Sequence, residues 1–116
     1  KNGRVIRPDI GITRVYRTEV GLGIATLVPD GPAARAGLRG FRLVRTQKRR
    51  GPFVYEETRV DRGHADIILT SDGQPVRTTE DLLDIVERKQ PGDEVVVSVL
   101  REDQELHVGV VLGTDE

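Results

Sequence analysis

One short segment constrains the fold of this chain more than any other. Residues 31–38 read Gly-Pro-Ala-Ala-Arg-Ala-Gly-Leu. Pro32 suits the first position of a helix, where its missing N–H costs nothing, and Gly37 suits a left-handed helix end. Because the side chains between Pro32 and Gly37 are Ala apart from Arg35, the helix is thin. We therefore expect a short helix that packs close against a sheet.

Short apolar segments on both sides of this helix predict the strands. They cover residues 10–17, 22–28, 66–69, 75–76, 94–101 and 106–112. In the last of them, apolar residues recur at every second position, the period of a half-buried strand. Asp72-Gly73 is typical of a tight hairpin turn, and residues 101–104 join the last two segments into a second hairpin.

A second, longer helix is predicted to begin after Thr78. Thr78 suits the N-cap, and Asp81 stands at the capping-box spacing. Apolar residues at helical spacing form one stripe, which includes Leu82, Ile85 and Val86. Pro91-Gly92 ends the helix. The order of elements predicts an α+β fold, a partly open β-barrel of five to six strands capped by two helices.

Length, charge and cysteine content exclude several classes of protein. The 116 residues suffice for a single domain, and the net charge of -1 gives no general attraction for nucleic acid. That total hides an asymmetry, since residues 39–62 carry eight basic and three acidic side chains, whereas residues 80–116 carry three basic and eleven acidic ones. The absence of cysteine excludes disulfides and thiolate metal sites. We expect no metal and no cofactor, because the spacing of His64 and His107 matches no established metal site.

Several short sequence motifs occur in an order that resembles a PDZ domain. The resemblance is closest to the PDZ domains attached to trypsin-like serine proteases of the HtrA/Deg family. The motifs are residues 3–8 (Gly-Arg-Val-Ile-Arg-Pro), 9–12 (Asp-Ile-Gly-Ile), 31–38, 66–68 (Asp-Ile-Ile), 72–76 (Asp-Gly-Gln-Pro-Val), 79–82 (Thr-Glu-Asp-Leu) and 91–93 (Pro-Gly-Asp). The resemblance implies that residues 1–9 are a linker from an upstream protease domain and that residues 10–113 form the PDZ domain.

The sequence departs from the family in two places. Asp9 stands where the family often has an aromatic residue. It brings a negative charge beside the loop at Gly11, which the resemblance implies is the site for a peptide carboxylate. We expect Asp9 to be a solvated loop residue rather than a specificity element. The second departure is a basic insertion at about residues 41–62, predicted to be a loop or β-hairpin with its turn at Gly51-Pro52. Its cluster Lys48-Arg49-Arg50 indicates a solvated loop or, as the alternative, contact with an acidic protein surface or anionic lipid.

The loop around Gly11 is the candidate peptide-binding site. Successive backbone N–H groups that converge form a cup for an anion, and Gly11 has no Cβ to block the approach. Ile10, Gly11 and Ile12 are therefore the predicted carboxylate-binding residues. A peptide would then add as a strand along Ile12, Thr13 and Arg14. If Leu82 and Val86 point into the core, the opposite wall of the groove consists of Asp81, Ile85 and Arg88, with a core position for Ile85 as the alternative.

The resemblance implies a module that captures C-termini or extended peptide segments and regulates or targets an attached HtrA/Deg-type serine protease in protein quality control. The alternative is a scaffolding PDZ domain unrelated to proteolysis. The chain itself is not expected to be an enzyme, because neither Ser71 nor Ser98 lies in a Gly-x-Ser-Gly-Gly loop. Expected partners are unfolded-protein segments, the upstream protease domain and other subunits of an oligomeric parent. We expect no nucleic acid and no membrane contact, and a periplasmic or cell-envelope location.

Overall fold

The main sheet is antiparallel and open. The computed structural model describes residues 7–114, so most of the predicted linker lies outside the described residues. The strands run in the order β2-β3-β6-β8-β9, and β7 pairs with β6. Their bounds are β2 (Ile12–Arg17), β3 (Leu22–Leu27), β6 (Ile67–Ser71), β7 (Gln74–Pro75), β8 (Glu94–Arg101) and β9 (Gln104–Val111). Because β2 and β9 end this order, each leaves one edge of the sheet without a strand partner in it.

The two ends of the described chain meet in a small separate sheet. There β1 (Pro8–Asp9) pairs antiparallel with β10 (Gly113–Thr114). This pairing fixes the chain just before Ile10, and β2 begins only at Ile12, two residues later than predicted. The reason is Gly11, whose φ of +82° is incompatible with an extended strand. Residues 10–11 thus form a short loop before β2 instead of the first residues of that strand.

Both predicted helices form. The short helix α1 (Pro32–Arg35) has Pro at its start, and Gly37 follows it with a φ of +91°. The longer helix α2 (Thr79–Glu87) begins with a complete capping box, in which Thr78 Oγ1 accepts from the Asp81 N–H at 3.1 Å. One face of α2 is buried in the core through Leu82, Ile85 and Val86. These confirm the predicted capping and the predicted apolar stripe.

The core lies between the sheet and the two helices. Its fully buried side chains come mainly from strands, and they include Leu22, Ile24, Ile68, Val95, Val97, Val99 and Val110. Asp66 is also fully buried, directly before β6. It accepts two hydrogen bonds of 2.7 Å from the Arg101 guanidinium and one of 2.9 Å from the Arg39 N–H. Since its oxygens are satisfied, this carboxylate ties the end of β8 to the chain after α1.

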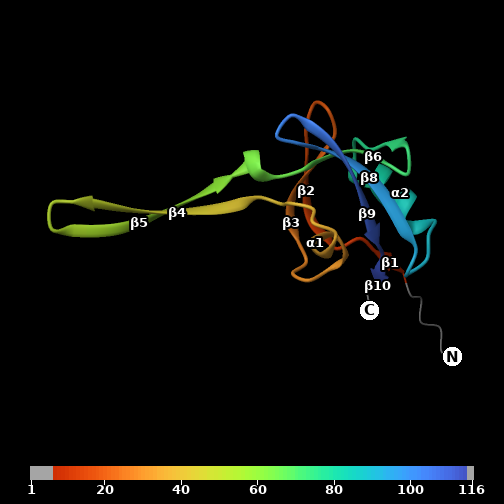
Figure 1. Cartoon of the computed structure of the whole chain (residues 1–116), viewed down its shortest axis with the longest axis horizontal. Helices are drawn as coiled ribbons and strands as arrows, with labels where there is room; N and C mark the ends of the chain where they lie inside the picture. Colours follow the sequence, from red (N-terminus) through yellow and green to blue (C-terminus); the bar gives the residue numbers. More distant parts are fainter. Residues whose placement is uncertain (1–6, 115–116) are drawn as a thin grey trace.

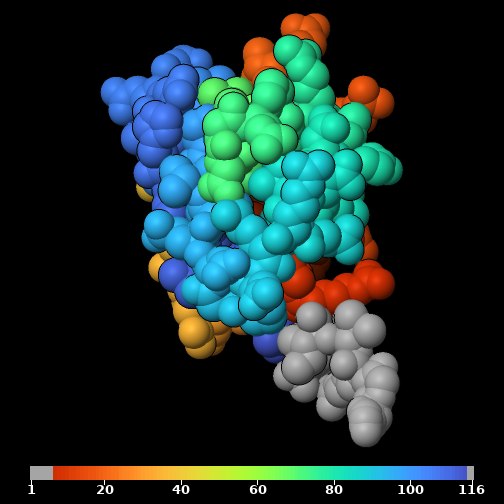
Figure 2. Space-filling view, turned by 90° about the vertical axis from the view of Figure 1, so that its right-hand side faces the viewer, coloured from red at the N-terminus to blue at the C-terminus, as the bar shows by residue number. Residues whose placement is uncertain are grey.

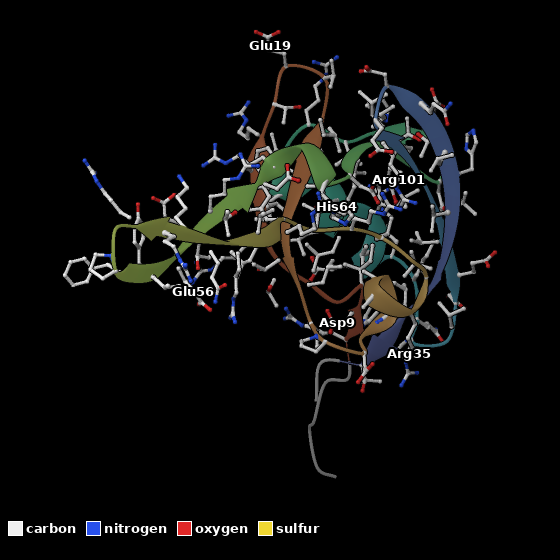
Figure 3. The ribbon with its side chains drawn as sticks, turned by 60° about the vertical axis from the view of Figure 1, so that its left-hand side comes forward. Asp9, Glu19, Arg35, Glu56, His64 and Arg101 are labelled. Carbon is white, nitrogen blue, oxygen red and sulfur yellow. The ribbon has the colours of Figure 1, made fainter. Side chains whose placement is uncertain are left out.

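The basic insertion is a long β-hairpin that projects from the domain (Figure 1). Its strands are β4 (Arg42–Arg50) and β5 (Phe53–Asp61), paired along their whole length, and a 3-10 turn (Arg62–His64) follows them. The turn falls at residues 51–52, as predicted. The hairpin gives the molecule its extents of 64 × 36 × 20 Å. None of its strand residues is buried, and Figure 3 shows its side chains pointing into open space on both faces.

Candidate functional site

Gly11 lets the loop after β1 lie directly against the start of α1. A Cβ at this position would stand 2.8 Å from Pro32 Cδ, so a larger residue would push α1 away. Two hydrogen bonds hold the loop: Ala33 N–H donates to the Ile10 carbonyl and Val28 N–H donates to the Gly11 carbonyl, each at 2.9 Å. The glycine therefore serves a close approach of two backbone segments as well as a positive φ.

These two bonds determine where the neighbouring N–H groups point. The described chain has no cis peptide bond, and in a trans peptide the C=O and the following N–H point in opposite directions. Since the Ile10 carbonyl faces α1, the Gly11 N–H faces away from it. The Gly11 carbonyl faces β3 in the same way, so the Ile12 N–H faces the open edge of β2. Neither N–H group is directed at α1 or β3, and the convergence of these donors on one anion stays a prediction.

A side chain of the protein itself binds one of these donors. The Gly11 N–H donates to Asp9 Oδ1 at 3.1 Å, and Asp9 is only partly exposed. No ion pair joins Asp9 to any other residue between 7 and 114. Our expectation of a freely solvated Asp9 therefore needs correction, because its carboxylate binds the loop that is the candidate anion site.

A narrow, mainly apolar groove runs between β2 and α2. It has a volume of about 100 Å³ and is lined by Ile10, Ile12, Thr13, Val15, Leu22, Thr79, Leu82, Leu83 and Val86. Figure 2 shows the side of the molecule turned away from the hairpin, where α2 lies beside the N-terminal segment that leads into β2. Of the predicted groove residues on β2, Ile12 and Thr13 line it, whereas Arg14 does not. No hairpin residue contributes to the lining.

The wall formed by α2 differs from the one predicted. Thr79, Leu82, Leu83 and Val86 line it, at the spacing i, i+3, i+4 and i+7 of one helix face. Leu82 and Val86 point into the core, as expected, and they line the groove as well, so the groove lies over the buried face of the helix rather than beside it. Thr79 and Leu83 are the exposed members of this face.

The three α2 residues predicted for the wall have other positions. Ile85 is in the core, and Arg88 is the C-cap of the helix. The Asp81 carboxylate accepts from the N–H groups of Arg77 at 3.0 Å and Thr78 at 3.2 Å. These backbone hydrogen bonds, that from Arg77 first, lower the pKa of Asp81 although desolvation raises it. Asp81 is thus occupied in capping the helix.

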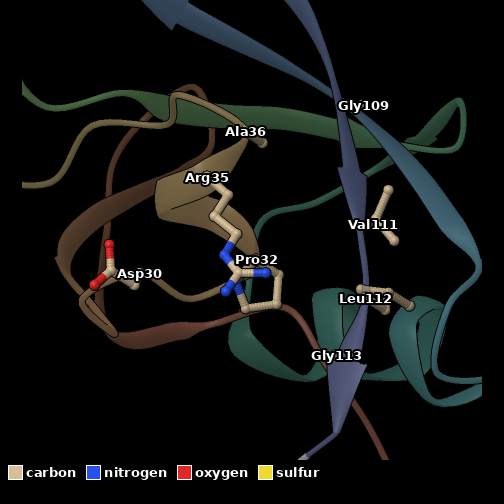
Figure 4. Close-up of a pocket in the computed structure, with 8 residues that line it drawn as sticks. All are labelled: Asp30, Pro32, Arg35, Ala36, Gly109, Val111, Leu112 and Gly113. Atoms are coloured by element: carbon tan, nitrogen blue, oxygen red, sulfur yellow. The ribbon is translucent and has the colours of Figure 1, made fainter.

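A second, wider cleft lies on the opposite edge of the sheet, and no sequence motif indicated it. Its volume is about 490 Å³, and it is lined by Asp30, Pro32, Arg35, Ala36, Gly109, Val111, Leu112 and Gly113. Figure 4 shows α1 forming one wall and β9 the other. Charged side chains stand on its α1 side, whereas the residues that line the groove beside β2 are uncharged. We therefore take the smaller groove as the candidate binding site.

Comparison with known proteins places the chain in a family. The sequence profile of the PDZ domain matches residues 8–112, and the chain therefore belongs to the PDZ domain family. Over 90 residues it is 32% identical to a probable periplasmic serine endoprotease, DegP-like, of Halomonas elongata, a match that covers 78% of this chain and 14% of that protein. The resemblance to HtrA/Deg PDZ domains that the sequence motifs indicated is confirmed.

Solved structures of HtrA-type proteases share the fold. The HtrA-type protease AlgW with a decapeptide is 25% identical, with a TM-score of 0.70, and is matched over 98% of this chain and 31% of that one. The serine endoprotease from Yersinia pestis is 29% identical, with a TM-score of 0.68, and is matched over 99% of this chain and 32% of that one. The chain thus spans about a third of these structures and about a seventh of the curated relative.

Within residues 7–114, no helix combines the length and the apolar character that a membrane span needs. Over the same residues, His, Asp and Glu side chains do not gather in threes where they could hold a metal ion.

Proposed function

We propose that this PDZ domain captures an extended peptide segment as an added strand beside β2, with peptide side chains seated in the groove against α2. The observation that carries the proposal is the open edge of β2 beside an apolar groove. An exposed strand edge offers unpaired N–H and C=O groups to an incoming peptide. The groove adds selectivity for apolar side chains, since its lining is almost entirely aliphatic.

We further propose that the domain regulates or targets an attached HtrA/Deg-type serine protease. Support comes from the relatives, which are serine endoproteases much longer than this chain. The chain contributes peptide binding, and the protease domain of the parent contributes the cleavage. Exposed segments of misfolded proteins are the substrates that this arrangement favours, in keeping with a role in protein quality control. The name of the Halomonas relative supports a periplasmic location.

The proposed function is tested by placing a charge in the groove. Leu83 lines it and is 48% exposed, so Leu83→Glu leaves the core intact but forces a peptide side chain to desolvate a carboxylate. We expect this variant to bind a fluorescently labelled, apolar, extended peptide at least about tenfold more weakly than the wild type. The measurement is fluorescence anisotropy with the peptide in free-acid and amide forms.

The matched control is Leu43→Glu. Leu43 is 60% exposed on the hairpin, so this variant carries the same chemical change far from the groove. Its peptide affinity should equal that of the wild type. Equal affinities for all three proteins, or a loss only in Leu43→Glu, would contradict binding in this groove.

A further inference from the structure

We propose that Asp9 is a specificity-determining residue that turns this groove away from free C-termini. Its carboxylate occupies the Gly11 N–H, the donor that a terminal carboxylate of a peptide would need. The preferred ligand is then a peptide segment without a terminal carboxylate, such as an internal stretch of an unfolded chain. The inference rests on the proposed function of the groove and refines its ligand class.

The position of Asp9 relative to the groove carries the first step. The Gly11 N–H lies in the loop between Ile10 and Ile12, and both of these side chains line the groove. A terminal carboxylate seated at this end of the groove would meet the Gly11 and Ile12 N–H groups. The Gly11 N–H already donates to Asp9 Oδ1 at 3.1 Å. An incoming carboxylate must therefore displace Asp9 or approach without that hydrogen bond.

The charge of Asp9 carries the second step. Two carboxylates that share one site repel each other and disfavour the doubly ionised state. Among residues 7–114 no cation forms an ion pair with Asp9 that would offset this repulsion. Arg7, two residues away, reaches Glu87 on α2 at 3.6 Å. Asp9 thus places a carboxylate beside the N–H groups that a terminal carboxylate would bind.

The same geometry favours a ligand other than a terminal carboxylate beside Asp9. The pairing of β1 with β10 fixes the Asp9 backbone, and the bond to Gly11 orients its side chain. Figure 3 shows Asp9 beside the α1 end of the domain, remote from the hairpin residue Glu56. A carboxylate held in this way is an acceptor for N–H groups of a passing peptide backbone or for a Lys or Arg side chain. An internal segment supplies backbone N–H groups to Asp9 without bringing a second carboxylate beside it.

The test compares two forms of one labelled, apolar-ended peptide, the free acid and the C-terminal amide. Wild-type chain should bind the amide at least as tightly as the acid. Asp9→Ala frees the Gly11 N–H and removes the charge, so its acid-to-amide affinity ratio should rise at least about tenfold. Asp9→Asn keeps a side-chain acceptor without the charge and should give an intermediate ratio. Asp103→Asn, in the exposed turn after β8, makes the same change of net charge and should match the wild type.

The possible results separate the two proposals. A wild type that prefers the free acid as strongly as Asp9→Ala does would overturn the role of Asp9 while leaving peptide binding in place. A ratio that rises equally in Asp103→Asn would also overturn it, because the effect would then be one of net charge. Absence of saturable binding of either peptide to all four proteins would overturn the proposed function and the inference that rests on it.

Discussion

Single carboxylates hold together parts of this domain that are far apart in the sequence. Asp66 binds Arg101, and Asp72 binds Lys89 at 2.7 Å. The two pairs differ in burial. The Asp66 carboxylate is inaccessible to solvent, so removing Arg101 would leave an uncompensated buried charge. Asp72 is partly exposed, and its contribution depends on solvent conditions.

Asp72 makes the stability of the domain depend on pH. Its carboxylate accepts from the Val96 N–H at 2.9 Å as well as binding Lys89. Desolvation raises the pKa of Asp72, but the hydrogen bonds from Lys89 and Val96 outweigh it and bring the pKa below the usual 3.8. Because the folded pKa is depressed, the stabilisation is complete above the unfolded pKa and is lost as the pH falls through the folded one.

The variant Asp72→Asn tests this pH dependence. Asn tolerates the positive φ of +49° at this position, so the backbone is not strained. We expect the wild type to exceed the variant in unfolding free energy by about 0.5–1 kcal/mol at neutral pH, because solvent screens the pair. The gap should narrow as the pH falls through the unfolded pKa of about 3.8 and then through the lower folded one. Urea unfolding over a pH series measures it, and a gap that stays constant down to pH 2.5 would contradict this assignment.

The sequence predicts a special backbone position at Gly11 but not that the Asp9 carboxylate accepts a hydrogen bond from its N–H. Gly11 was identifiable because a glycine between two isoleucines, followed by the other family phrases, indicates a special backbone position. The hydrogen bond from Gly11 to Asp9 was not, although it is local, because an Asp side chain can equally point into solvent. Asp9 therefore looked like a solvated loop residue.

Among the elements, the hairpin depends least on the core. Its strands have no buried residue, and a two-stranded ribbon is marginally stable in water by itself. It is anchored at its base, where the Phe41 ring lies 5.1 Å from the Tyr16 ring and the Arg62 guanidinium stacks over it at 5.4 Å. Phe41 N–H also donates to the Ala25 carbonyl at 2.8 Å.

We predict that the hairpin can be removed without unfolding the domain. Replacing residues 42–61 by an Asn-Gly turn keeps Phe41, Tyr16 and Arg62 together. The unfolding free energy should change by less than about 1 kcal/mol, because the removed residues contribute nothing to the core. Peptide affinity should be unchanged. Urea unfolding followed by circular dichroism, with a peptide titration, tests both; loss of a cooperative transition would show that the hairpin supports the fold.

The elements themselves were largely predictable, whereas their orientation was not. Pro32, Gly37, Thr78 and Pro91-Gly92 act locally, and they marked both helices correctly. The apolar stripe of α2 was also visible. Which side of that stripe faces β2 depends on how the helix is rotated on the sheet, a long-range property. For this reason the sequence leaves Ile85 open between groove and core, and the structure places it in the core.

The hairpin and the two open edges of the main sheet lie in different parts of the molecule. The hairpin projects on one side of the domain, and α2 lies on the other (Figure 1). The two unpaired edges of the main sheet, β2 and β9, each border a cleft. The groove at β2 has apolar walls and outward N–H groups, and the cleft at β9 has a charged rim. This difference is the basis for assigning peptide binding to β2.

The most direct measurement is an NMR study of the wild-type chain with a bound, isotopically distinguished peptide. Our account predicts intermolecular NOEs between the peptide backbone and Ile12, Thr13 and Val15, in the pattern of a strand added to β2. It also predicts contacts from peptide side chains to Leu83. NOEs confined to the cleft between α1 and β9, or to the hairpin, would contradict the central claim.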